Sequence, residues 1–102
     1  FEYEKQASFP GGVDSLRKYM ARNLRYPPLA KAQDKQGRVR VQFTITKDGS
    51  LEDIFVVNSV DPSLDQEAIR LVTQMPKWIP ATQDGKLVNM YFILPVVFQL
   101  RE

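Results

Sequence analysis

The clearest pattern in the chain is a strict alternation of apolar and polar residues over residues 38–46. The apolar members of this stretch fall on one face of an extended chain: Val39, Val41, Phe43 and Ile45. Such alternation predicts a strand with one face on the core and one in water. Asp48-Gly49 follows as a hairpin signal, and residues 51–59 predict the returning strand. Its consecutive apolar residues at 55–57 indicate a bulge, or cover on both faces.

Two other stretches carry apolar residues at helical spacing. The first predicts a helix over residues 13–25, because apolar positions recur every three or four residues before a pair of prolines stops the pattern. The second helix is predicted to begin after Asp61, which precedes a proline at the first helical position, and to end at Pro76. Residues 28–37 could add one further turn, and residues 76–85 are predicted as a loop.

The last predicted strand, residues 86–100, is apolar on both faces and is interrupted by Pro95. Its even-numbered residues are predicted to face the helices: Val88, Met90, Phe92, Leu94, Val96, Phe98 and Leu100. Its odd-numbered apolar residues are predicted to face away from them: Leu87, Tyr91, Ile93 and Val97. Proline is tolerated at a sheet edge because its missing N–H need not face a neighbour. We therefore expect this strand at an edge, with one apolar face uncovered.

The order of the predicted elements is helix, strand, strand, helix, strand. A right-handed crossover then places the last strand beside the first, with every neighbouring pair antiparallel. The predicted fold class is α+β: a two-layer fold with a three-stranded antiparallel sheet of order 2-1-3 and two helices on one face. At 102 residues the chain is expected to form a single domain, with residues 1–12 as an N-terminal extension and residues 13–100 as the folded core.

Three occupants of the exposed edge are compatible with this pattern. The N-terminal segment FEYEK, in which Phe1 and Tyr3 alternate with glutamates, could form a short strand and pair with the edge or lie across it. A second copy of the chain could pair with the edge in a homodimer. A peptide from another protein could instead add itself as a further strand, the mode called β-augmentation.

Composition excludes several kinds of chemistry. The chain has no cysteine and no histidine, so it has no thiol nucleophile, no Cys-based zinc site and no imidazole base. Asp61 and Asp65 form a candidate carboxylate pair, but their positions favour a helix cap and a solvated acid. No further oxygen ligands follow Asp48 at the spacing of a calcium loop. We therefore expect no enzymatic activity, no metal and no cofactor.

Charge is distributed unevenly along the chain. Residues 1–40 hold nine Lys or Arg against four Asp or Glu, whereas residues 41–102 hold five against eight. A basic amino-terminal part is a feature of nucleic-acid-binding proteins, but the aromatic signature of RNA-recognition domains and the GXXG clamp are missing. We therefore expect no nucleic-acid partner. The sequence also shows no signal peptide and no run of the roughly 20 apolar residues that a membrane helix needs.

Seven motifs follow one another over about residues 9 to 100: FPGG, RYP, QGRVRVQFTITKDGSLEDIFV, DPSLDQEAIRLV, MPKWIPA, DGKLV and LPVVFQL. Together they resemble the carboxy-terminal domain of the TonB family, in the form most similar to copies from Bacteroidetes-type bacteria. The resemblance implies the same fold that the hydrophobic pattern predicts. It also implies a periplasmic domain of a protein that is anchored in the inner membrane and transduces energy for transport.

The resemblance further implies partners and a site. TonB proteins carry energy from a proton-driven inner-membrane motor to outer-membrane receptors, and the domain binds a short extended receptor segment, the TonB box. The box would pair with the last strand, and the stretch before the Tyr-Pro motif would also contact it. The implied partner-binding residues are Leu24, Arg25, Tyr26, Leu87, Val88, Asn89, Met90, Tyr91, Phe92 and Ile93. Arg25 stands where the family carries a smaller polar residue, which implies an acidic complement on the receptor.

A second function is compatible with the same resemblance. The domain also occurs in other membrane proteins, including sensor-like ones, where it would serve periplasmic interaction or dimerisation without transport coupling. The chain begins at Phe1 rather than at methionine, so we expect a fragment whose membrane anchor and proline-rich spacer lie elsewhere.

Overall fold

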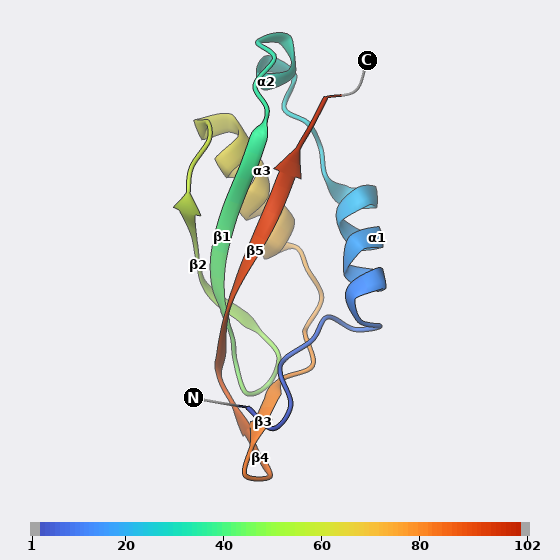
Figure 1. Cartoon of the computed structure of the whole chain (residues 1–102), viewed down its shortest axis with the longest axis vertical. Helices are drawn as coiled ribbons and strands as arrows, with labels where there is room; N and C mark the ends of the chain where they lie inside the picture. The colour runs from blue at the N-terminus through green and yellow to red at the C-terminus, as the bar shows by residue number, and fades with distance from the viewer. Residues whose placement is uncertain (1–2, 101–102) are drawn as a thin grey trace.

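The computed structural model describes residues 3–100, and Figure 1 shows their arrangement as a sheet with helices packed beside and behind it. The elements follow in this order: α1 (Val13–Asn23), α2 (Pro28–Ala32), β1 (Gly37–Ile45), β2 (Leu51–Asn58), α3 (Pro62–Thr73), β3 (Ala81–Gln83), β4 (Lys86–Val88) and β5 (Met90–Phe98). The main sheet has the order β2-β1-β5 with antiparallel neighbours, which confirms the predicted α+β fold and the order 2-1-3.

Strand β1 forms the centre of the sheet and of the core. Its fully buried side chains are those that the alternation predicts: Val39, Val41, Phe43 and Ile45. It pairs with β5 in unbroken register along its whole length. Its pairing with β2 slips twice, and Asp53 adopts a φ of 52° within β2. The predicted bulge in the second strand is therefore confirmed.

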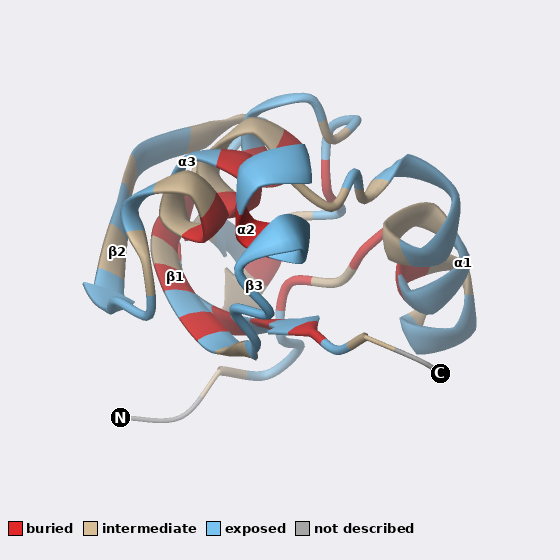
Figure 2. Ribbon diagram, turned by 90° about the horizontal axis from the view of Figure 1, so that it is seen from above, coloured by how far each residue is buried: buried red, intermediate tan, exposed pale blue. Residues whose placement is uncertain are grey.

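Helix α3 packs against β1 and β2 and covers that face of the sheet (Figure 2). Its start is fixed by Asp61, whose carboxylate accepts a hydrogen bond from the main-chain N–H of Ser63 at 3.1 Å, and by Pro62 at the first helical position. The buried residues of α3 are Leu64, Glu67, Ala68, Leu71 and Val72. Four of the five are apolar, so burial of one helical stripe holds α3 on the sheet.

Helix α1 lies beyond the sheet, alongside β5 rather than over its centre (Figures 1 and 2). Leu16 is the only buried residue of α1, and Tyr19 and Met20 are half-buried. The hydroxyl of Tyr19 donates to the carbonyl oxygen of Leu71 in α3 at 2.8 Å and so links the two helices. The prediction placed both helices over one face of the sheet. Helix α3 covers that face, whereas α1 lies beside the edge formed by β5.

An aromatic cluster closes the core near the start of β5. The ring of Trp78 lies 5.5 Å from that of Phe43, 5.3 Å from that of Phe92 and 5.8 Å from that of Phe9, measured between centroids. The main-chain N–H of Trp78 donates to the carbonyl of Gly49 at 2.9 Å. Gly49 has a φ of 88°, and a Cβ there would lie 2.1 Å from the carbonyl oxygen of Trp78. This hairpin turn therefore requires glycine.

The prediction of a loop over residues 76–85 is wrong at its end, because β3 pairs with β4 as a hairpin. Asp84 and Gly85 form its turn with φ of 53° and 74°, as a type I′ turn requires at both central positions. The predicted single strand over residues 86–100 is likewise divided at Asn89 into β4 and β5. Three residues are too few to show alternation, but the Asp-Gly pair is a signal that marks such a hairpin.

The N-terminal segment forms its main-chain pairs beside this hairpin, and it contacts β5 at its start, where the main-chain N–H of Ala7 donates to Sδ of Met90 at 3.3 Å. Its main-chain pairs are two isolated antiparallel bridges: Lys5 with Thr82, and Ser8 with Ile79. The short strand considered for the FEYEK segment begins in residues 1–2, which lie outside the described part of the chain. Ala7 and Phe9 are buried, so part of the predicted extension over residues 1–12 contributes to the core.

Candidate peptide-binding edge

One edge of β5 has no partner strand within residues 3–100, because β1 pairs with the opposite edge. In an antiparallel ladder, successive residues direct their N–H and C=O groups alternately toward the partner and away from it. Pro95 lies opposite Arg40 in unbroken register and has no N–H to donate to β1. The odd-numbered residues of β5 therefore direct their main-chain groups to the open edge. Tyr91, Ile93 and Val97 supply N–H donors there, and Pro95 supplies only its carbonyl.

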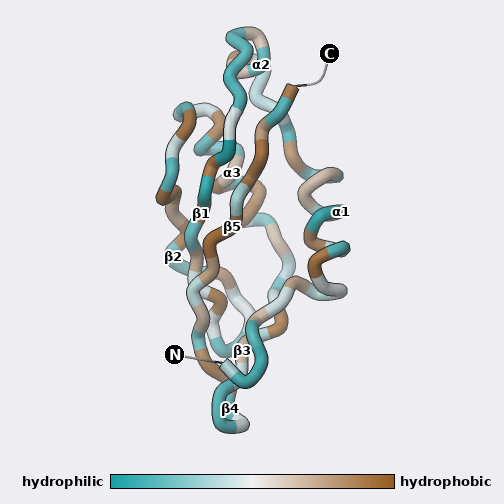
Figure 3. Tube along the Cα trace, in the orientation of Figure 1, coloured by the Kyte–Doolittle hydropathy of each residue, from teal (hydrophilic) through white to brown (hydrophobic). Residues whose placement is uncertain are grey.

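The side chains of the same odd-numbered residues form an exposed apolar row. Tyr91, Ile93 and Val97 are 72%, 49% and 48% exposed. The buried residues of β5 are even-numbered: Met90, Leu94, Val96 and Phe98. This alternation confirms the predicted faces of the last strand within residues 90–98, and Figure 3 shows how much of β5 is apolar. Apolar side chains beside unpaired main-chain groups are what strand addition requires.

A hollow of about 250 Å³ separates β5 from α1 beside this open edge. We call it the α1–β5 groove, and its lining residues are Arg17, Met20, Ala21, Leu24, Val96 and Val97. Leu16, Met20 and Leu24 are spaced four residues apart, so they form one stripe along α1 and its C-cap, and all three pack against the core. The walls of the groove are therefore mostly apolar, and Arg17 is the charged residue among them.

Two of the predicted contact residues before the Tyr-Pro motif pack at the far end of β5. Leu24 lines the α1–β5 groove, and Tyr26 packs edge-on against Phe98 with ring centroids 5.6 Å apart. The hydroxyl of Tyr26 donates to the carbonyl oxygen of Lys35, beyond α2. The connection between α1 and α2 is thereby fixed beside the last residues of β5.

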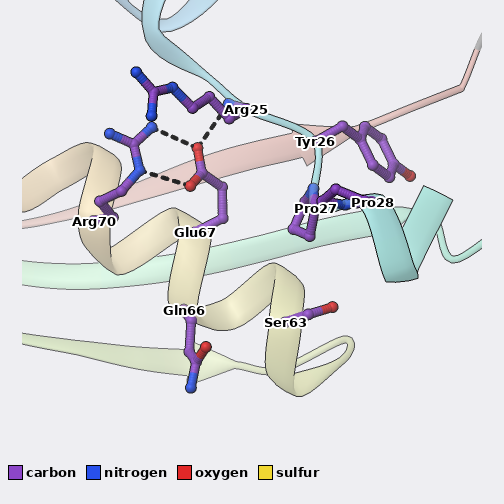
Figure 4. Close-up of a pocket in the computed structure, with 8 residues that line it drawn as sticks. All are labelled: Arg25, Tyr26, Pro27, Pro28, Ser63, Gln66, Glu67 and Arg70. Carbon is purple, nitrogen blue, oxygen red and sulfur yellow. Dashed lines mark hydrogen bonds and ion pairs between the residues drawn. The ribbon is translucent and has the colours of Figure 1, made fainter.

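Arg25, the third of these residues, is held by the carboxylate of Glu67 in α3 (Figure 4). The main-chain N–H of Arg25 donates to Oε2 of Glu67 at 2.7 Å, and Arg70 donates from Nε to Oε1 and from Nη2 to Oε2, also at 2.7 Å. Burial raises the pKa of Glu67, but these hydrogen bonds outweigh it and hold the pKa below its ordinary value. The side chain of Arg25 is exposed, beside a hollow of about 370 Å³, and forms no ion pair among residues 3–100.

The predicted residues of the last strand have different surroundings. Residues 87–88 belong to β4, one edge of which is already paired with β3. The side-chain oxygen of Asn89 accepts a hydrogen bond from the main-chain N–H of Lys47 at 3.0 Å. Within β5, Tyr91 and Ile93 are the predicted residues whose exposed side chains lie along the open edge.

The structure does not bring the two predicted groups together. Residues 24–26 lie beside the end of β5, whereas residues 87–93 lie at its start or before it. Roughly 20 Å of extended chain separates Tyr91 from Val97, and the open edge runs between them. Sequence reasoning missed part of the groove, namely Arg17, Met20, Ala21, Val96 and Val97. The four-residue spacing of the apolar stripe on α1 was the signal that could have found its helical wall.

The acidic residues at the start of α3 serve the main chain. Asp61 caps the helix, and Asp65 accepts hydrogen bonds from the main-chain N–H of Val60 at 3.2 Å and from the hydroxyl of Ser59. Among the described residues, no three acidic side chains lie close enough to hold a metal ion. The helices of the same part of the chain are all too short or too polar to cross a membrane.

Comparison with known sequences identifies relatives. Residues 22–100 match the family described as Gram-negative bacterial TonB protein C-terminal. Protein TonB of Helicobacter pylori is 30% identical over 104 residues, which cover 97% of this chain and 35% of that protein. Protein TonB of Pseudomonas aeruginosa is 38% identical over 63 residues, which cover 62% of this chain and 18% of that protein. The chain thus spans about a third of the length of these relatives or less.

Solved structures show a similar fold. The solution structure of the Helicobacter pylori TonB carboxy-terminal domain has a TM-score of 0.65 at 24% identity, covering 91% of this chain and 88% of that chain. That of Pseudomonas aeruginosa has a TM-score of 0.58 at 32% identity, covering 76% and 79%. The family match spans Leu24 and all of β5. The chain therefore belongs to the family of TonB carboxy-terminal domains.

Proposed function

We propose that this domain binds an extended segment of outer-membrane receptors by strand addition to the open edge of β5. The observation that carries the proposal is the edge itself, where Tyr91, Ile93 and Val97 combine outward main-chain groups with exposed apolar side chains. Hydrogen bonds between main chains would give affinity, and side-chain contacts would give preference among segments. Membership of the TonB family supports the choice of a receptor as the partner.

The domain would then be the periplasmic end of a protein anchored in the inner membrane. It would couple a proton-driven motor, which contacts other parts of the protein, to active uptake by the bound receptor. The proposed contact residues are Leu24, Arg25, Tyr26, Leu87, Val88, Asn89, Met90, Tyr91, Phe92 and Ile93. Of these, Tyr91 and Ile93 would pair with the segment through their main-chain groups at the open edge. The exposed side chain of Arg25 would meet an acidic residue elsewhere on the receptor.

An amide NMR titration tests this function. The probes are synthetic peptides of about twelve residues that copy N-terminal segments of outer-membrane receptors from the same organism. We expect shifts concentrated at the amides of residues 87–94, 96–97 and 24–26. The shifts should persist when the salt concentration rises from about 50 to about 500 mM, because main-chain pairing is screened far less than contacts between exposed charges.

A matched control is the same peptide with proline at two alternate positions, which removes the N–H groups that pair with β5. We expect at least about tenfold weaker binding of that peptide. If no receptor peptide shifts the amides of β5, strand addition to receptors is wrong. The sensor-type alternative, in which a second copy covers β5 without transport coupling, would then be favoured.

A further inference from the structure

A fourth strand added at the open edge of β5 would lie between β5 and α1, so α1 would flank it. Helix α1 lies on the open side of β5 in both views (Figures 1 and 2), and the α1–β5 groove separates the two elements. Neighbouring strands of a sheet lie about 4.8 Å apart, so a strand added to β5 would run beside α1. Successive side chains of that strand would point alternately toward α1 and toward solvent. Helix α1 would thus contact every second residue of the bound segment.

The surface that meets those residues is mostly apolar near the end of β5, where Met20, Leu24 and Val96 line the groove. Toward the start of β5 a separate hollow of about 210 Å³ is lined by Leu16 and Phe92 and also by residues 6–9 of the N-terminal segment. Polar side chains buried in the groove would lose water without finding hydrogen-bond partners. The residues of the segment that meet Met20, Leu24 and Val96 therefore have to be apolar.

Arg17 adds one positive charge to this apolar surface. It is exposed, it lines the groove together with Val96 and Val97, and neither of the two ion pairs among residues 3–100 includes it. No acidic residue lines the groove. A carboxylate on the segment would therefore meet the Arg17 guanidinium near the end of β5, and a guanidinium can pair with a carboxylate through two hydrogen bonds.

We propose that the occupant of the α1–β5 groove is an extended receptor peptide with apolar residues at alternate positions and one Asp or Glu that pairs with Arg17. The inference rests on the proposed function and adds to it the chemistry by which the segment is chosen. Strand β5 supplies sequence-independent hydrogen bonds, and α1 selects the side chains.

A double-mutant cycle tests this pairing. Each acidic residue of the tightest-binding receptor peptide is changed to its amide, one at a time, and Kd is measured by NMR for the wild type, Arg17→Glu and Arg22→Glu. Arg22 is the matched control, because it is exposed on the same helix but lines a different hollow with Phe9 and Tyr19. We expect one amide change to weaken binding to the wild type and to Arg22→Glu by about three- to tenfold, and to leave binding to Arg17→Glu unchanged or tighter.

Lysine at the same peptide position should bind Arg17→Glu better than it binds the wild type. Amide spectra of both variants, recorded without peptide, establish that each is folded. If every acid-to-amide change has the same effect on both variants while β5 still shifts, the pairing with Arg17 is wrong and strand addition stands. If no receptor peptide binds the wild type, both proposals fail together. Concentration-dependent shifts of the groove residues without peptide would make a second copy the occupant and overturn the pairing.

Discussion

Glu67 links helix α3 to the segment that follows α1, and no pattern in the sequence predicts this link. It is only 8% exposed, and its carboxylate accepts hydrogen bonds from Arg70 within α3 and from the main chain at Arg25. Arg70 in turn donates to the carbonyl oxygen of Asn23 at the end of α1, at 2.8 Å. Periodicity predicts which face of a helix is buried, but it does not show that the carboxylate of Glu67 accepts a hydrogen bond from the main chain of a distant segment, at Arg25.

We expect Glu67→Gln to lower the free energy of unfolding by about 1–3 kcal/mol. The neutral amide leaves the Arg70 guanidinium without its charged partner and can accept from only one side-chain oxygen. Urea denaturation followed by Trp78 fluorescence measures the loss. Glu52→Gln is the matched control, since Glu52 is exposed in β2, and it should change stability by less than about 0.5 kcal/mol. Equal losses in the two variants would show that the Glu67 hydrogen bonds contribute nothing specific.

The difference in stability between the wild type and Glu67→Gln should depend on pH. The pKa of Glu67 is lower in the folded state than its ordinary value, so its contribution is complete above the unfolded pKa of about 4.3 and is lost as pH falls through the folded pKa. The urea midpoints of the wild type and Glu67→Gln should therefore converge below about pH 4. Asp48, whose pKa hydrogen bonds from Thr46 and Ser50 lower to about 2, adds a further loss at lower pH in both proteins. A constant difference between the midpoints would contradict the assignment.

Strand β5 has one buried and one exposed face because its side chains alternate, and this alternation is visible in the sequence. A charge placed at Phe92 would enter the aromatic cluster, whereas a charge placed at Tyr91 would point into water. Phe92 lies 5.7 Å from Phe43 and 5.3 Å from Trp78 between ring centroids, and Tyr91 is exposed. The same substitution at adjacent residues therefore separates the stability of the domain from the use of its edge.

We expect Phe92→Asp to cost at least about 3 kcal/mol, a large share of the roughly 5–15 kcal/mol that stabilises a domain. Tyr91→Asp should cost less than about 1 kcal/mol and should weaken peptide binding. Near-ultraviolet circular dichroism of the Trp78 cluster reports the fold, and the NMR titration reports binding. If Tyr91→Asp binds receptor peptides as tightly as the wild type, the open edge of β5 is not where they bind.

Alternation and helical spacing locate the strands and helices along the chain. The rule that crossover connections are right-handed then gives the strand order, so both could be predicted from the sequence. The β3–β4 hairpin escaped prediction because its strands are too short to show a period. The placement of α1 could not be predicted for a different reason. Periodicity shows that Leu16 and Met20 face inward, but it does not show whether the helix lies over the centre of the sheet or beside its edge. The family resemblance implied Tyr91 and Ile93 as site residues, but it did not imply Arg17, which lines the groove only because α1 lies beside β5.

Burial is distributed unevenly over the assembled domain. Helix α1 contributes one buried residue, whereas α3 contributes five. We expect native-state hydrogen exchange to show opening of α1 at a free energy at least about 1–2 kcal/mol below that of α3 and β1. Saturation with a receptor peptide should raise protection in α1, since the peptide would pack against it. Equal protection of α1 and α3 in the free domain would mean that both belong to one cooperative unit.

The bulges of β2 limit how many chains can join this sheet. A regular edge offers hydrogen-bonding groups at every second residue, but β2 slips register twice and turns at Asp53, so its outer edge presents no continuous run. A sheet that grows into a fibre must accept a new chain at both edges. With one usable edge, the domain accepts a single strand and growth ends there. The apolar edge of β5 can therefore stay exposed without leading to polymers.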